Sequence, residues 1–287
     1  MSCAMLEVIK TRLESPTSIL THMQCPRKYY YRYIKRLGQE QSIYLVMGSI
    51  VHSTIAAFHR TDISEVPSEG FFEILRSRTM GDLDTRWVEN RGELEKLNLN
   101  PEEISFFYDE ARSMIGNFCQ HHVNKLIACQ YRYNISAEEA FRRLRPKAET
   151  KITSEKLGVM GVVDAIHNFD GQTVIIDYKT SKKDEIDTDC MVQLAIYALL
   201  YREYFGRLPD KVGIHFLRHG EKIMRVSPGL LAWGKKKCEE VRNLTASREE
   251  ADYPKNMSGL CKYRTGQCDY YGVCKVNSYS SGGIRGS

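Results

Sequence analysis

Long apolar runs are missing from this 287-residue sequence. The most apolar stretch, residues 194–201, is far shorter than the roughly 18 residues of a membrane span. The first residues include Glu7 and Lys10 and lack the apolar segment of a secretory signal. We therefore expect a cytoplasmic protein without a membrane partner.

Extremes of composition are also missing. With 42% hydrophobic and 27% charged residues, the sequence is not that of a collagen, a coiled coil or a disordered chain. Residues 62–110 contain 13 acidic and 5 basic side chains, although the net charge of the whole chain is +5. The rest of the chain is therefore basic, which suits a polyanionic partner such as nucleic acid.

Cysteine, in contrast, is plentiful. The cytosol keeps thiols reduced, so clustered cysteines among the nine in the chain are first interpreted as metal ligands. Three of them, Cys261, Cys268 and Cys274, lie close together near the C-terminus. This segment is a candidate metal site.

Breaks in the pattern divide the chain into five segments. We expect N-terminal helices over residues 1–60, a helical insertion over 61–146, an α/β core over 147–250, a cysteine segment over 251–277 and a disordered tail over 278–287.

The first helix should begin at Ser15-Pro16 and be kinked at Pro26. Arg27 and Lys28 follow the kink among four tyrosines. These cations either form a solvated face over tyrosines that pack inward, or contact phosphates and bases of a nucleic acid.

The core begins with β-rich runs. Strands are expected at residues 147–153, 159–167 and 173–179, then a helix at 190–205, a second hairpin formed by 212–217 and 222–226, and a helix from 228. The pair Asp170-Gly171 is typical of a two-residue hairpin turn. The sequence therefore predicts a mixed α/β domain interrupted by the helical insertion.

The hairpin register predicts the position of two carboxylates. If Asp170 and Gly171 are the loop, Asp164 lies directly opposite Asp177. Lys179, two residues after Asp177, points to the same face of its strand. Because two opposed carboxylates repel each other, they need a cation nearby.

That cation could be Lys179 alone, in a structural ion pair, or a divalent metal ion. Mg²⁺ prefers oxygen ligands and typically takes one or two carboxylates, so we favour the metal. A metal held by two aspartates beside a lysine suits phosphodiester hydrolysis, because it stabilises charge on the phosphate and lowers the pKa of a bound water.

Gln193 and Tyr197 share one face of the helix that follows, because they are four residues apart. Near a metal they could hydrogen-bond a phosphate or a base. The alternative is a surface glutamine and a tyrosine at the edge of the core.

Taken in order, these residues resemble the RecB-type branch of the PD-(D/E)XK nuclease superfamily, and in particular its iron-sulfur members, which include the AddB nuclease domain and CRISPR-associated exonucleases. The resemblance rests on Cys25-Pro26-Arg27, on Gly48 followed by His52, on Gly161 to Asp164, on Asp177-Tyr178-Lys179 and on Gln193 with Tyr197. It implies a restriction-endonuclease-like core, with a mixed central sheet flanked by helices.

The resemblance also implies roles for single residues. His52, Asp164, Asp177 and the carbonyl of Tyr178 would hold one or two Mg²⁺ or Mn²⁺ ions, and Lys179 would be catalytic. Gln193 and Tyr197 would help to bind DNA. Glu149 would lie either at the metal or behind its ligands.

Cys25 would join the three C-terminal cysteines. Four thiolates can bind a 4Fe-4S cluster or tetrahedral zinc, and the resemblance favours the cluster. It would fasten the C-terminal segment to the opening helix.

We therefore expect a metal-dependent DNA exonuclease that acts at single strands or frayed ends in DNA repair, recombination, viral replication or CRISPR adaptation. Its protein partners would belong to a repair or adaptation complex. The alternative is a non-catalytic subunit that binds DNA ends for a helicase or an integrase. The intact pair of aspartates with its lysine favours the enzyme.

Overall fold

The computed structural model describes residues 12–263 and 266–279. Its centre is a five-stranded sheet in the order β1-β2-β3-β4-β5. Only β3 and β4 run parallel, and the other neighbours are antiparallel. The strands are β1 (Lys147–Ser154), β2 (Val159–Phe169), β3 (Gln172–Lys179), β4 (Lys211–Phe216) and β5 (Gly220–Arg225).

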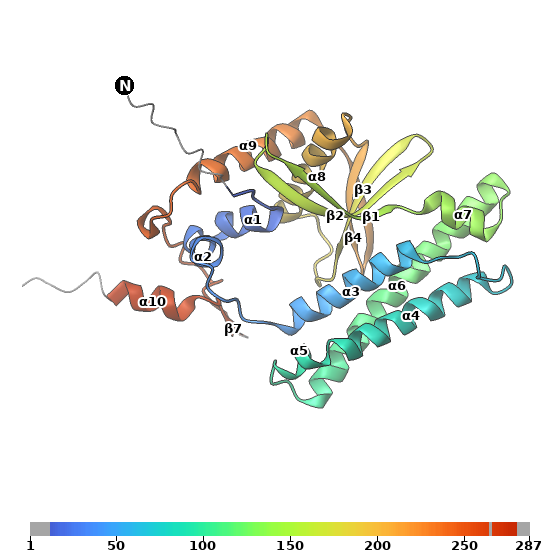
Figure 1. Ribbon diagram of the computed structural model, residues 1–287, viewed down its shortest axis with the longest axis horizontal. Helices are drawn as coiled ribbons and strands as arrows, with labels where there is room; N and C mark the ends of the chain where they lie inside the picture. The colour runs from blue at the N-terminus through green and yellow to red at the C-terminus, as the bar shows by residue number, and fades with distance from the viewer. Residues whose placement is uncertain (1–11, 264–265, 280–287) are drawn as a thin grey trace, which may run out of the picture.

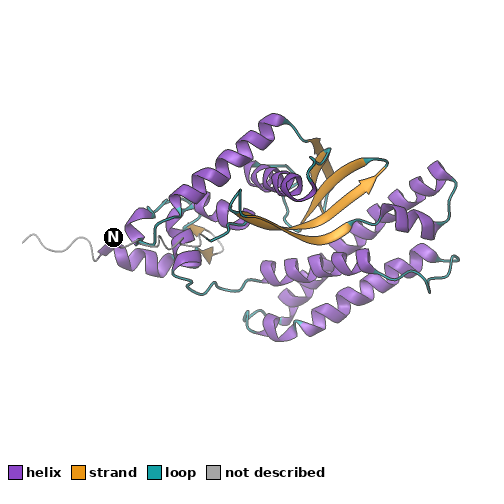
Figure 2. Ribbon diagram, turned by 45° about the horizontal axis from the view of Figure 1, so that its top comes forward, coloured by secondary structure: helices purple, strands orange, loops and turns teal. Residues whose placement is uncertain are grey.

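Helices cover both faces of this sheet (Figure 2). One face packs against three helices through an apolar cluster that includes Val163 and Ile175. These helices are α1 (Pro16–Gln24), α8 (Thr188–Phe205) and α9 (Pro228–Leu244). Because α8 joins the parallel strands β3 and β4, it is the crossover of a βαβ unit.

The opposite face packs against the helical insertion and the helix before it (Figure 1). Tyr178 and Ile176 of β3 belong to this second apolar cluster. Its helices are α3 (Ile43–Arg60), α4 (Phe71–Glu89), α5 (Arg91–Glu95), α6 (Pro101–Tyr133) and α7 (Ala137–Leu144). The architecture confirms the predicted α/β core with a mixed central sheet flanked by helices.

The predicted hairpin turn is present. Phe169 pairs with Gln172, and the register continues to Ala165 with Ile176. Asp170 and Gly171 have φ angles of 50° and 75°, the left-handed values that this two-residue turn requires. Local turn chemistry therefore sets the register of the two strands.

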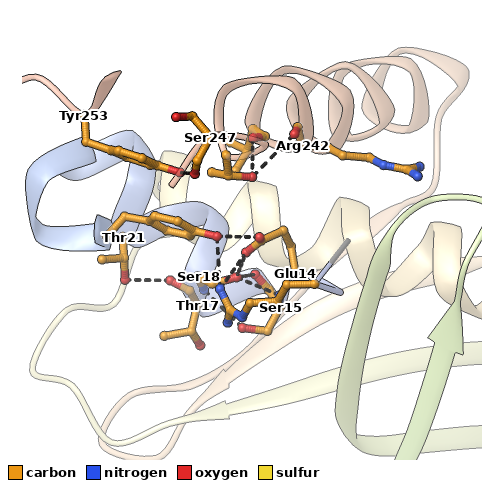
Figure 3. Close-up of polar contacts among 12 residues, drawn as sticks. Glu14, Ser15, Thr17, Ser18, Thr21, Arg242, Ser247 and Tyr253 are labelled. Atoms are coloured by element: carbon orange, nitrogen blue, oxygen red, sulfur yellow. Dashed lines mark hydrogen bonds and ion pairs between the residues drawn. The ribbon is translucent and has the colours of Figure 1, made fainter. Parts of the chain in front are cut away.

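The N-terminal helix is anchored by a buried carboxylate, Glu14 (Figure 3). Its backbone bridges β2, donating to the carbonyl of Gly158 at 2.9 Å and accepting from the amide of Met160 at 2.7 Å. Its side chain accepts hydrogen bonds from the hydroxyls of Ser18 and Tyr29. These contacts fix α1 beside the strand that carries Asp164.

The C-terminal segment packs on the first helices. After α1 come α2 (Pro26–Tyr29) and a π-helical turn at Tyr30–Ile34. The ring of Tyr253 stacks on that of Tyr29, with centroids 6.0 Å apart, and Asn256 donates a hydrogen bond to the carbonyl of Gln24 at 2.8 Å. Residues more than 220 positions apart are thus held together.

The C-terminal segment is more ordered than predicted. Two short strands, β6 (Lys262–Tyr263) and β7 (Gly266–Gln267), precede α10 (Tyr271–Tyr279). Residues 278 and 279, which were expected in the tail, belong to α10, and residues 280–287 lie outside the described residues. Within the described part of the chain, no helix has the length and apolarity needed to cross a membrane.

Candidate active site

Asp164 lies where β2 is kinked. Val163 packs in the cluster with α8, whereas Ala165, two residues later, packs in the cluster with the insertion. In a regular strand, residues two apart share a face. The ladder to β3 ends at Ala165, and the neighbouring position on β1, Glu149, has a φ of 46°. The ladder has the predicted register, but it ends one residue before Asp164, so it does not include the predicted pair of Asp164 with Asp177.

Two groups from different elements contact the carboxylate of Asp164. Nδ1 of His52, on α3, is 3.5 Å from Oδ1. The backbone amide of Tyr178 donates to Oδ2 at 2.9 Å. The structure therefore brings His52, Asp164 and the backbone of β3 together.

Asp177 and Lys179 point to the α8 face, as their spacing predicts. Nζ of Lys179 is 2.9 Å from Oδ2 of Asp177 and donates to Oε1 of Gln193 at 2.6 Å. Gln193 donates from Nε2 to Oδ1 of Asp177 at 2.7 Å, and the same nitrogen is 2.9 Å from the hydroxyl of Tyr197. The amide of Gln193 thus holds the carboxylate and the ammonium in one network.

The electrostatics of this network favour an additional cation. Burial raises the pKa of Asp177 to about 6, and the charge of Asp164 adds to this rise against the opposing effect of Lys179. Burial alone would lower the pKa of His52, but the hydrogen bond and charge of Asp164 raise it above its ordinary value. Burial is the largest cause of the shift of Asp177, and the like charge of Asp164 adds a smaller repulsion that a bound cation would relieve.

The residues fit a divalent metal ion. Oδ2 of Asp177 is buried, and the contact that it has is the ion pair with the ammonium of Lys179. The carbonyl of Lys179 points to β4, where it accepts from Leu217, so the peptide groups of Tyr178 point to the opposite side, toward Asp164. Two carboxylates and a carbonyl are oxygen ligands that Mg²⁺ or Mn²⁺ takes, and His52 adds an imidazole to this donor set.

These donors are not yet arranged as in a closed metal site. Atoms of His52, Asp164 and Asp177 do not gather within 4.8 Å of one another. Asp177 is instead turned toward Lys179 and Gln193. A bound cation would have to draw Asp177 away from its ammonium partner.

Two of the predicted DNA contacts have a different environment. Tyr197 is buried, with 5% of its surface exposed, and Gln193 is engaged with Asp177 and Lys179. In this arrangement both side chains orient the carboxylate and the lysine. Glu149 is exposed and forms an ion pair with Arg60 at 2.6 Å, so the structure does not bring its carboxylate to the aspartates.

The four predicted cluster cysteines line one cavity of about 170 Å³. Cys25 stands between α1 and α2, and the others lie in the C-terminal segment. Burial raises the pKa of the thiols of Cys268 and Cys274. The cavity is also lined by Arg27, Lys28, Lys255 and Lys275, whose positive charges suit a group that bears four thiolates.

The basic, tyrosine-rich segment packs inward. Tyr29, Tyr30 and Tyr31 are buried in one aromatic cluster. Arg27 forms an ion pair with Glu250 at 2.5 Å and donates to the carbonyl of Tyr253, and Lys28 donates to Gln24 at 3.0 Å. The structure thus places Arg27 and Lys28 beside the cysteines and away from the aspartates.

The sequence did not predict a hydrogen bond that joins β3 to α3 on the insertion side of the sheet. The hydroxyl of Tyr178 lies 2.9 Å from Nε2 of buried His59, on the insertion face. Helical spacing places His59 on the inner face of α3 after His52, but a lone histidine in such a position carries no specific signal.

The sequence matches the PD-(D/E)XK nuclease superfamily over residues 14–275. The chain belongs to this superfamily. It has no match among the curated proteins.

Two solved structures are similar. One is a crystal structure from Eubacterium rectale, described provisionally as an exonuclease, with 14% identity, a TM-score of 0.49 and coverage of 91% of this chain and 92% of that chain. The other is the crystal structure of SSO0001, with 20% identity, a TM-score of 0.30 and coverage of 66% of this chain and 80% of that chain.

Proposed function

We propose that this member of the nuclease superfamily is a divalent-metal-dependent DNA exonuclease that acts at single strands or frayed ends. The observation that carries the proposal is the buried carboxylate of Asp177, which has the ammonium of Lys179 as its cationic partner while Asp164 adds a second negative charge to the site. One ammonium does not balance two carboxylates in a buried setting, and a metal ion would supply the missing positive charge. Mg²⁺ or Mn²⁺ is the cation that its oxygen-rich surroundings suit.

In this proposal, four groups hold the metal: the carboxylates of Asp164 and Asp177, the imidazole of His52 and the carbonyl of Tyr178. The ion would polarise the scissile phosphate and lower the pKa of a bound water. Gln193 and Tyr197 keep Asp177 in place, because the amide of Gln193 contacts both the carboxylate and the hydroxyl.

Lys179 is the catalytic cation. Its pKa is raised by the neighbouring Asp177, although burial opposes this, so it stays protonated at neutral pH. With a metal held by Asp177, the ammonium of Lys179 would be available to orient the attacking water or to stabilise charge on the phosphate. Its side chain is 29% exposed, which leaves it accessible to a DNA strand.

We further propose that Cys25, Cys261, Cys268 and Cys274 hold a 4Fe-4S cluster, as in the iron-sulfur branch of the superfamily, and that zinc is the less favoured occupant. Support comes from the single cavity that the four cysteines share and from its basic lining. The reducing cytoplasm would keep the thiols available for ligation. Protein partners in a repair or adaptation complex would direct the enzyme to DNA ends.

An assay with purified protein tests the nuclease. End-labelled single- and double-stranded DNA is incubated with Mg²⁺, with Mn²⁺ or with EDTA. We expect loss of the labelled ends in both metals and none in EDTA. A protein that binds DNA ends but cleaves neither substrate in either metal would instead be the non-catalytic subunit.

A further inference from the structure

A second group of metal-ligating side chains lies on the opposite face of the sheet from Asp177. The ligand atoms of His121, His215 and Glu221 all lie within 4.8 Å of one another. His215 is on β4 and Glu221 is on β5, while His121 comes from helix α6 of the insertion. The group therefore spans the junction between the insertion and the core.

The fold brings these residues together by two independent rules. His215 pairs directly with Glu221 across the β4–β5 hairpin, so their side chains share a face. On α6, Asn117, His121 and Lys125 recur at helical spacing and all face this hairpin. Asn117 donates to the carbonyl of Leu217 at 3.0 Å, which fixes the helix beside the strands.

His121 provides an orphaned nitrogen. Its Nε2 is buried and has no hydrogen-bond partner among the described residues, and it stands 3.7 Å from Oε2 of Glu221. The rings of His121 and His215 have centroids 4.5 Å apart at 60°, so they are not stacked face to face. This separation of the nitrogen and the carboxylate oxygen is close to the distance between two ligand atoms of one metal ion.

We propose that His121, His215 and Glu221 form a Zn²⁺ site. Two imidazoles and one carboxylate are a known donor set for this ion, with water completing the tetrahedron. Ligand atoms at a tetrahedral Zn²⁺ lie about 3.3 Å apart, given bonds of about 2.0–2.1 Å. The donors here need to close only modestly, and half-exposed His121 provides the entrance.

Lys125 is the local competitor for Glu221. Its Nζ lies 3.0 Å from Oε1 and 2.9 Å from Oε2, so the ammonium neutralises the buried carboxylate when no metal is bound. With Zn²⁺ on Oε2, Lys125 keeps its bond to Oε1. Zinc would thus replace the ammonium at Oε2 only, and Lys125 competes with the metal for that oxygen.

Bound zinc would join the insertion to the face of the sheet opposite Asp177, next to strand β3. His215 pairs with Tyr178 on the neighbouring strand, and their rings are 5.8 Å apart. Tyr178 lies between Asp177 and Lys179 in the sequence. A zinc ion here would hold α6, β4 and β5 together without touching the carboxylates on the other face.

Zinc binding by the full-length protein tests this proposal. Metal-free protein is titrated with Zn²⁺ alone against a chromophoric chelator, and bound zinc is counted after dialysis. We compare the parent with His121→Gln and Glu221→Gln. His219→Gln is the control, because His219 lies in the turn between β4 and β5 and its Nε2 is 3.1 Å from the carbonyl of Lys182.

Zinc could also bind at the cysteines or at the aspartates, so the signal is the difference between variants. We expect His121→Gln and Glu221→Gln to lose one equivalent of zinc, or to bind it more than about 100-fold more weakly. Removing a group that only orients a ligand costs up to about 100-fold, so removing a ligand itself should cost more. His219→Gln should match the parent. If His121→Gln and Glu221→Gln both bind as much zinc as the parent with equal affinity, the proposal is wrong.

Two measurements do not depend on folded ligand variants. Co²⁺ replacing Zn²⁺ at this site in the parent should add visible d–d absorption without a thiolate charge-transfer band. Lys125→Met keeps all three donors and removes the competitor, so it should tighten zinc binding and enlarge the thermal stabilisation by zinc. A cobalt spectrum made up only of thiolate-bound metal, or unchanged zinc affinity in Lys125→Met, would overturn the proposal.

Discussion

Gln193 donates a hydrogen bond to the carboxylate of Asp177 at 2.7 Å, while its carbonyl oxygen accepts from Lys179. One amide therefore fixes the relative positions of a buried acid and a cation that come from the same strand. Because Gln193 lies on α8, the crossover helix, the docking of this helix on the sheet determines the geometry of the site.

Replacing Gln193 with leucine should remove this orientation and leave the fold intact. We expect cleavage to fall about 10- to 100-fold, the usual cost of losing a partner of a metal ligand. The metal concentration at half-maximal rate should rise as well, which a purely structural defect would not cause. Gln120→Ala, on the exposed face of α6, is the matched control. An unchanged metal requirement in Gln193→Leu would argue against a positioning role.

Asp187 caps α8 and should make stability depend on pH in the acid range. A hydrogen bond from Lys183 and one from the amide of Cys190 lower its pKa to about 2. Since the unfolded value is about 3.9, this contribution is present above about pH 4 and is lost as the pH falls toward 2.

Two substitutions of Asp187 separate the cap from the charge. Asp187→Ala should cost about 1 kcal/mol of unfolding free energy at neutral pH. Asp187→Asn keeps the cap but cannot titrate, so it should lose less stability than the parent between about pH 4 and 2. Urea unfolding across that range measures both effects. Parallel pH profiles for the parent and Asp187→Asn would contradict this account.

Cys268→Ser should lower stability and DNA binding together. Residues of the C-terminal segment and of the first helices both line the cavity at Cys268. A cluster bound there would link these distant parts of the chain, and its loss would loosen the contact between them. Iron and sulfide content, visible absorbance and thermal unfolding are the measurements. Buried Cys238 on α9, remote from that cavity, provides the control variant Cys238→Ala. A colourless Cys268→Ser protein with the thermal stability of the parent would count against a structural cluster.

The contact between α8 and α9 requires glycine at position 234. A Cβ atom there would come within 2.5 Å of the Cβ of Ala195, so Gly234→Ala should destabilise the protein by about 1–3 kcal/mol through overpacking. On the same helix, a Cβ at Gly229 would meet nothing closer than 3.9 Å, and Gly229→Ala should be neutral or slightly stabilising. Equal stability of the two variants by urea unfolding would refute this packing argument.

The fold could be predicted where the signals are local. Asp170-Gly171 determines a turn, and alternation along the strands then fixes the face of Asp177 and Lys179. Ser15 caps the helix that it was expected to begin. Such signals depend on a few adjacent residues, so a single sequence contains them.

Contacts between distant segments could not be predicted in this way. The kink at Asp164 depends on packing against two different clusters, which no neighbouring residue announces. His121 is 94 positions before His215 in the numbering, and only the packing of α6 on the hairpin brings them together. Arg27 looked like a phosphate ligand because its partner, Glu250, is remote in the sequence.

The most direct test of the nuclease is the cleavage rate of Asp177→Asn with Mg²⁺, measured on end-labelled DNA beside the parent. The change keeps the size of the side chain and removes the charge that the metal needs. We predict that the rate falls about 1,000-fold or more, because several kcal/mol of charge stabilisation are lost, while circular dichroism and thermal unfolding stay near those of the parent. Cleavage by folded Asp177→Asn at the parental rate would contradict the account.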